Sequence, residues 1–161
     1  MKIVIAVACA FLITAGLAAE TAGGKVLLVY DEVNVNSDPY VAQFRETLAA
    51  EGLAFEEAVA GSMAGKDLAA YDTVLIYGMV QAFNMKSPIR DWLKTKPGLE
   101  NKRVSLFVTA NRWFLKNLFV QLTKLLDKQK AELVDAVSMA TKDMDAGAKE
   151  AAVRAQVLRL K

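Results

Sequence analysis

The chain has one cysteine and no histidine among its 161 residues. The single cysteine, Cys9, lies inside an apolar run near the N-terminus, too early in that run for the usual site of lipid attachment. Without a second cysteine there is no internal disulfide, and without histidine the commonest general base and zinc ligand are missing. Ser-His hydrolysis and most zinc sites are therefore excluded. Any catalytic chemistry must come from carboxylates, hydroxyls, amines or a bound cofactor.

An excess of either charge is also lacking, because 20 basic residues are nearly matched by 18 acidic ones. The formal net charge of +2 gives no electrostatic footprint for nucleic acid. Hydrophobic residues make up 54% of the chain and charged residues 24%, which favours a folded core over disorder. The length suits one ordinary domain and is too short for two. We therefore expect one globular domain that does not bind nucleic acid.

The first residues, MKIVIAVACAFLITAGLAAE, have the layout of a secretory signal peptide. A lysine precedes an uncharged apolar run, and Gly16 and Ala18 suit the small-residue positions before a cleavage site. We predict that residues 1–18 are a cleaved signal peptide and that the protein is exported, to the periplasm or outside the cell. The rival interpretation is an uncleaved membrane anchor over residues 3–19, because the run is near the minimum length for spanning a bilayer. Membrane contact is expected only in that case.

Apolar runs typical of strands alternate with helical patterns over residues 25–161, which we interpret as one domain. Strands are predicted over Val26–Tyr30, Phe55–Ala60, Thr73–Tyr77, Val104–Thr109 and Ala131–Ala140. Helices are predicted from Asp38 to Gly52, Ser87 to Lys96, Trp113 to Lys128 and Met144 to Leu160. Asp38 and Ser87 are the expected N-caps, because each is followed by a proline suited to the first helical turn. This alternation favours a parallel sheet with right-handed crossovers.

Three segments would lie beyond the carboxyl ends of the strands, where ligands bind in such sheets. In residues 31–37, hydrogen-bonding side chains precede a helix N-terminus, which attracts anions: Asn34, Asn36 and Ser37. Residues 78–87 supply a glycine that permits close backbone approach, together with apolar side chains that would line a slot: Gly78, Met79, Val80, Phe83 and Met85. In residues 110–113, three side chains would flank the same slot: Asn111, Arg112 and Trp113. The alternative is that Phe83 and the methionines only cover the sheet end, that Trp113 is core, and that Arg112 complements Asp31 and Glu32.

The order of these segments resembles the flavodoxin-like family. In YDTVLIYGMVQAFNMKSPIRDWLKTKPGLENKRVSLFVT, a strand ends in glycine, an aromatic-bearing loop leads to a proline-started helix, and a lysine-rich link precedes the next strand. The resemblance covers nearly all of the chain after residue 24. It implies a flavodoxin-like three-layer α/β sandwich with a five-stranded parallel sheet in the order 2-1-3-4-5. It also implies a site for flavin mononucleotide (FMN), with the phosphate at residues 31–37 and Phe83 on the flavin ring.

The first of the three loops departs from the family's phosphate loop. Glu32 stands in place of a hydroxyl residue and Val35 in place of the glycine. Valine resists the positive φ that a phosphate-binding loop often needs. Repulsion between a phosphate and a carboxylate about 4 Å away reduces the binding free energy by on the order of several kcal/mol, whereas attraction by a helix N-terminus contributes about 0.3–1 kcal/mol. The alternative is a plain strand-to-helix turn capped by Asp38.

We therefore expect an exported flavodoxin-like domain that serves as a binding or accessory module, for a small molecule or a protein, without conventional FMN binding. A chain exported unfolded cannot carry a bound flavin with it. The competing interpretation is an FMN-dependent electron-transfer protein or reductase, in which the flavin supplies the chemistry. No catalytic residue is predicted, and whether the protein is an enzyme stays open. No metal ligand is predicted either, because the cluster of Asp31, Glu32 and Asp38 lacks the ligand repeat of a calcium loop.

Overall fold

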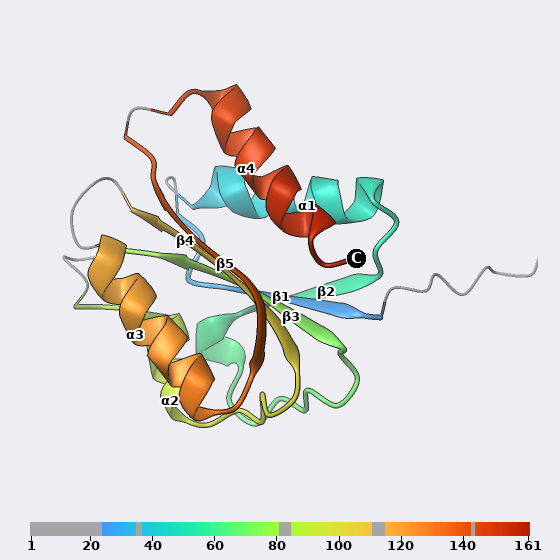
Figure 1. The fold of residues 1–161 in the computed structure, drawn as a ribbon, viewed down its shortest axis with the longest axis vertical. Coiled ribbons are helices and arrows are strands. Elements are labelled where there is room, and N and C mark those ends of the chain that lie inside the picture. Colours follow the sequence, from blue (N-terminus) through green and yellow to red (C-terminus); the bar gives the residue numbers. More distant parts are fainter. Residues whose placement is uncertain (1–23, 35–36, 81–84, 111–114, 143) are drawn as a thin grey trace, which may run out of the picture.

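A computed structural model describes residues 24–34, 37–80, 85–110, 115–142 and 144–161. Five strands alternate with helices along these residues (Figure 1). The strands are β1 (Val26–Tyr30), β2 (Phe55–Val59), β3 (Thr73–Met79), β4 (Arg103–Ala110) and β5 (Glu132–Ala140). The helices are α1 (Asp38–Ala50), α2 (Pro88–Lys94), α3 (Leu115–Lys128) and α4 (Ala146–Leu158), with a 3-10 turn, η1, at Ala60–Ser62.

The strands form one parallel sheet in the order β2-β1-β3-β4-β5, which confirms the predicted fold class and strand order. β1 lies between β2 and β3, with Val29 opposite Ala58 on one side and Ile76 on the other. Because all strands run the same way, their carboxyl ends meet at one edge of the sheet. The loops that follow β1 and β3 therefore start side by side, since Tyr30 and Tyr77 are register partners.

Two helical layers cover the sheet, α1 and α4 on one face and α2 and α3 on the other (Figure 1). Side chains alternate along each strand. On β1, Leu27 and Val29 join the core beneath α2 and α3, while Leu28 and Tyr30 join the core beneath α1 and α4. Every residue of β1 and β3 is buried. Burial on both faces explains why these strands are continuous apolar runs in the sequence.

The largest difference from the predicted strand ends is at β3, which continues to Met79. Gly78 and Met79, expected in a loop, extend the ladder by pairing with Val108 and Thr109 of β4. The end of α1 agrees with the sequence, because Gly52 follows it with a φ of 69°, a left-handed conformation that glycine adopts without strain.

The two predicted N-caps differ in outcome. Ser87 caps α2 as predicted, because its side chain accepts a hydrogen bond from the N–H of Arg90. The predicted cap at Asp38 is wrong, since the N-cap of α1 is Ser37, whose side chain makes no capping hydrogen bond. Pro39 does lie in the first turn of α1, where its missing N–H costs nothing.

The segment predicted as a signal peptide or anchor lies outside the described residues, so both interpretations remain predictions. Among the residues that are described, no helix combines the length and apolar character that crossing a bilayer requires.

Candidate functional site at the carboxyl edge of the sheet

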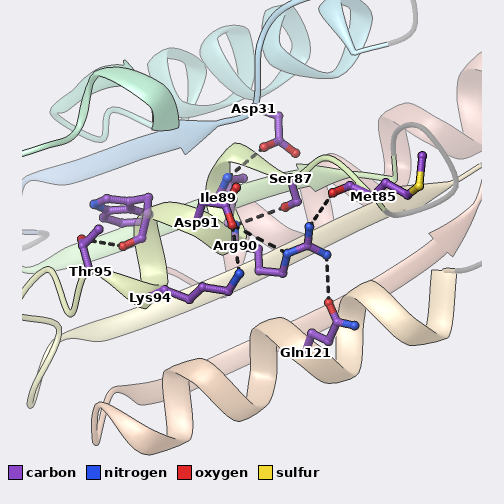
Figure 2. A network of polar contacts seen from close by, with 10 residues as sticks. Asp31, Met85, Ser87, Ile89, Arg90, Asp91, Lys94, Thr95 and Gln121 are labelled. Carbon is purple, nitrogen blue, oxygen red and sulfur yellow. Dashed lines mark hydrogen bonds and ion pairs between the residues drawn. The ribbon is translucent and has the colours of Figure 1, made fainter.

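A buried carboxylate, Asp31, lies immediately after β1. Its side chain is 2% exposed and points toward α2 (Figure 2). Oδ2 accepts a hydrogen bond from the backbone N–H of Met79 over 3.1 Å, and Oδ1 accepts one from the N–H of Ile89 over 3.1 Å. Asp31 therefore joins the end of β1 to the end of β3 and to the first turn of α2.

The surroundings of Asp31 oppose its ionisation. Burial raises the pKa of Asp31 to about 6; the N–H donors of Met79 and Ile89 limit the rise, as does Arg90, while Glu32 adds to it. A buried carboxylate is tolerated when its oxygens accept hydrogen bonds. Asp31 is thus a structural acceptor whose proton can be gained or lost near neutral pH.

Asp31 lies on the opposite side of the chain from an exposed rim position: it is buried, whereas Glu32 is exposed. Whether Arg112 complements Asp31 and Glu32 stays a prediction, because Arg112 lies outside the described residues. The alternation along β1 explains why Asp31 is buried. Leu27 and Val29 point into the core beneath α2 and α3, and Asp31 is the next residue on that face. This alternation was the signal in the sequence that would have identified Asp31 as buried.

The described part of the loop after β1 is closed by its own hydrogen bonds. The Ser37 hydroxyl accepts a hydrogen bond from the N–H of Asn34 over 2.9 Å and lies 3.3 Å from the carbonyl oxygen of Glu32. The N–H of Ser37 donates to the backbone carbonyl of Asn34 at 3.0 Å and to its Oδ1 at 3.3 Å. Ser37 is 1% exposed, so its hydroxyl is directed into the loop, away from solvent. This contact also explains why the Ser37 side chain does not cap α1.

An ion pair between Glu32 and Lys86 links this loop to the segment before α2. Glu32 Oε2 lies 2.8 Å from Lys86 Nζ, and both side chains are more than half exposed. Because Lys86 neutralises much of the charge of Glu32, the repulsion between Glu32 and a bound phosphate is smaller than it would be for an isolated carboxylate. Lys86 was missed in the sequence, where it lies 54 positions after Glu32. Its place directly before the Ser87 cap was the available signal.

Gly78 and Met79 lie next to Asp31, as the end of β3 requires. A Cβ added to Gly78 would lie 3.5 Å from Leu122, 3.7 Å from Ile89 and 3.9 Å from Asp31, which are ordinary contact distances. Gly78 does not have a positive φ, so neither its conformation nor its packing demands glycine. Met79 is mostly buried, and its N–H is bonded to Asp31.

Met85 and Arg90 shape the entry to α2. Met85 is 79% exposed, and its backbone carbonyl oxygen accepts a hydrogen bond from Arg90 over 2.9 Å (Figure 2). A second nitrogen of Arg90 donates to Gln121 of α3 over 3.1 Å. Arg90 therefore fixes the segment before α2 against α3.

Several residues predicted for this site lie outside the described residues: Val35, Asn36, Phe83, Asn111, Arg112 and Trp113. Their roles remain predictions. Among the described residues there is no cluster of three or more metal-ligating side chains. Asp31, one of the three carboxylates considered for a cation together with Glu32 and Asp38, accepts a backbone N–H group on each of its oxygens.

The described polar groups of the loop after β1 do not fit a phosphate in their present arrangement. The Ser37 hydroxyl and the N–H groups of Asn34 and Ser37 are bonded within the loop. The N–H groups of Tyr40 and Val41, in the first turn of α1, both donate to the carbonyl oxygen of Ser37. A phosphate group would have to displace these contacts to use the same donors.

Solved structures resemble this fold, although no family model and no curated protein matches the sequence. A flavodoxin of Streptococcus pneumoniae TIGR4 matches with a TM-score of 0.69 and 10% identity, over 85% of this chain and 97% of that one. Oxidised flavodoxin 2 of Bacillus cereus matches with a TM-score of 0.67 and 16% identity, over 85% and 97% of the two chains. A flavo di-iron protein of Thermotoga maritima matches with a TM-score of 0.66 and 16% identity, over 85% of this chain but only 35% of that one. Such low identities establish the architecture alone, and the chain has a flavodoxin-like fold.

Proposed function

We propose that this protein is an exported flavodoxin-like domain that acts as a binding or accessory module and does not bind FMN in the conventional way. The main support is the closed loop after β1, in which the buried hydroxyl of Ser37 is bonded to Asn34 and Glu32. Moving that hydroxyl onto a phosphate would take the acceptor from the N–H of Asn34, which is partly buried. The net contribution of such a hydrogen bond is about 0.5–1.5 kcal/mol, and binding of the phosphate would have to exceed it.

Export is supported by the composition of the N-terminal segment. Residues 1–18 combine a lysine, an apolar run and small residues at the expected cleavage site. The intact mass of the protein from its native host tests this directly. We expect a species that begins at Ala19, and a cytoplasmic species that still begins at Met1 would contradict export.

A titration with FMN, followed by quenching of flavin fluorescence at moderate salt, tests the absence of conventional binding. We expect the unmodified protein to bind FMN weakly or not at all. The double variant Glu32→Thr with Val35→Gly removes a carboxylate and restores access to positive φ, and should tighten binding about tenfold, or roughly 1.4 kcal/mol. Micromolar or tighter binding by the unmodified protein would contradict the proposed function.

A matched control separates the position of the charge from its amount. Glu46 is an exposed residue of α1 for which no ion pair is found among the described residues. The variant Glu46→Thr with Val35→Gly changes the net charge equally but leaves Glu32 in place. If both double variants gain the same affinity, Glu32 is not the obstacle.

The second candidate function is an FMN-dependent electron-transfer protein or reductase. Its support is the similarity to flavodoxins over almost their whole length, and to a putative quinone reductase of Klebsiella pneumoniae with a TM-score of 0.60 and 16% identity. A bound flavin would supply the redox chemistry there. Tight FMN binding by the unmodified protein, with reversible reduction of the bound flavin, would make this the leading account.

A further inference from the structure

A basic groove lies between α2 and α3, on the outer side of that helical layer. It has a volume of about 440 Å³, and its lining consists of Arg90, Lys94, Gln121, Lys124, Leu125 and Lys128. Four of these six residues are basic and none is acidic. Lys128 also lines a neighbouring hollow of about 290 Å³, to which Lys96 and Lys130 contribute together with Glu100, which pairs with Lys130 over 3.2 Å. The positive charge therefore continues beyond the groove itself.

The cations of the groove are only partly neutralised. Lys94 pairs with Asp91 over 3.0 Å, and Arg90 Nε lies 4.0 Å from the same carboxylate. Lys124 and Lys128 form no ion pair within the part of the chain that the structure describes. Arg90 is held between the helices by Gln121 and the carbonyl oxygen of Met85 (Figure 2). The groove thus combines one anchored guanidinium with two unpaired ammonium groups.

The positive charge of the groove is local. The chain as a whole carries a net charge of +2. A groove on the opposite helical layer is lined by three carboxylates, Glu46, Glu51 and Glu150, and one cation, Arg154. The two grooves therefore differ in sign, and the basic groove is not a consequence of a generally basic protein.

We propose that the groove between α2 and α3 is a docking surface for an acidic segment of a partner protein. A segment with several carboxylates complements the cations of both helices at once, whereas each exposed ion pair alone contributes little. Leu125, which packs partly against the core, gives such a segment an apolar contact between the charges. Arg90 also contacts the segment before α2, but Lys124 and Lys128 lie in the C-terminal half of α3 and do not contribute to the loop after β1, so their part in docking does not depend on whether FMN binds there.

Binding of a synthetic peptide tests this docking surface. The probe is a fluorescent amphipathic helix-forming peptide of glutamate and leucine, and its control replaces every glutamate with glutamine. Fluorescence anisotropy at low ionic strength should show binding of the glutamate peptide that weakens as salt is added. The double variant Lys124→Glu with Lys128→Glu should lower the affinity by about tenfold or more. Thermal unfolding of the variant checks that it is folded.

A matched variant distinguishes the groove from net charge. Lys142 and Lys149 lie outside the α2 and α3 layer and form no ion pair within the described part of the chain. Lys142→Glu with Lys149→Glu makes the same change in net charge and should alter the affinity by less than about twofold. Equal losses in the two double variants would overturn the proposal, as would equal binding of the glutamine peptide.

Tripolyphosphate serves as a small-anion probe in the same assay. If the glutamate peptide binds and tripolyphosphate competes only at high concentration, the docking surface for a protein segment is supported. If tripolyphosphate binds with the same dependence on Lys124 and Lys128 while the peptide does not bind, the groove is a small-anion site and the proposal is wrong. Absence of binding by both probes would also overturn it.

Discussion

The backbone N–H of Ile89 donates a hydrogen bond to Asp31 Oδ1 over 3.1 Å, between residues 58 positions apart in the sequence. The N–H of Met79 donates to Oδ2 of the same carboxylate. The two hydrogen bonds join the carboxyl ends of β1 and β3 to the first turn of α2. The loops at this edge of the sheet therefore start from fixed positions, whichever ligand they bind.

Removal of both acceptor oxygens from this junction should destabilise the protein. Asp31→Ala leaves the buried N–H groups of Met79 and Ile89 without their acceptors. We expect a loss of about 1–3 kcal/mol in the free energy of unfolding at pH 5, below the folded pKa of Asp31 of about 6, so that the cost of burying its charge does not enter; the loss is measured with urea. Asp127→Asn, an exposed change on α3, is the control and should alter stability by less than about 0.5 kcal/mol. Equal effects of the two changes would refute the structural role of Asp31.

Asp31 should also make stability depend on pH between about 4 and 6. Its folded pKa of about 6 lies above the ordinary value of 3.8, so in this window the folded state keeps a proton that the unfolded state has lost. Stability from this group is therefore greatest at the acidic end and falls as pH rises, by up to about 1.4 kcal/mol per pH unit, before levelling off above pH 6.

The measurement compares unfolding free energies of the unmodified protein and Asp31→Asn at pH 4, 5, 6 and 7. Glu51 and Glu56 have lowered pKa values because of their hydrogen bonds to lysines, and they act in the opposite direction below their ordinary value of 4.5. Both proteins contain these residues, so their contribution cancels in the difference. A difference that stays constant from pH 4 to 6 would show that Asp31 does not titrate there.

A buried polar pair in the other core layer provides a third prediction. Gln156 of α4 donates a hydrogen bond from Nε2 to the hydroxyl of Ser105 on β4, and both residues are fully buried. Ser105→Ala leaves the amide without this acceptor and should cost about 1–3 kcal/mol. Adding Gln156→Leu removes the stranded polar group, so the double variant should recover most of the loss in thermal unfolding. Additive losses would contradict this account.

Gly78 gives a prediction of the opposite sign. Since an added methyl group fits against Leu122 and the backbone does not have a positive φ, Gly78→Ala should stabilise β3 by about 0.5 kcal/mol. Gly52→Ala is the contrasting change, because Gly52 has a φ of 69°, and it should destabilise the protein by about 1 kcal/mol. Urea unfolding of the two variants would contradict the comparison if both lost stability equally.

The fold could be predicted from the sequence because the local patterns of the strands agree with the packing of the folded sheet. The strands β1, β3 and β4 are buried on both faces, and such strands are continuous apolar runs that need no alternation to be recognised. The Ser87 cap followed from a serine before a proline. These features depend on neighbours in the chain, and so they could be predicted.

The candidate site was predicted less well because its contacts join distant residues. The ion pair of Glu32 with Lys86 and the bonds of Asp31 to α2 form only when β1 and β3 are paired. The N-cap of α1 was misplaced for a local reason, because Ser37 bonds back to Asn34 and the choice between two adjacent capping residues depends on that loop. The charge and polarity of the residues in the sequence did not show which polar groups would find hydrogen-bond partners inside the folded protein.

The interior position of β1 in the sheet, between β2 and β3, has a consequence for how the chain folds. This strand, the first along the described residues, pairs with β2 and β3 on either side, and just before it the N–H of Lys25 donates to Asp72, which is 47 positions away. A chain that emerges N-terminus first therefore holds Val26–Tyr30 without its second neighbour until Met79 has been synthesised. Closing so long a loop before any contact compensates for it makes this pairing slow. The apolar strand is exposed during that interval, and aggregation competes with folding most strongly then.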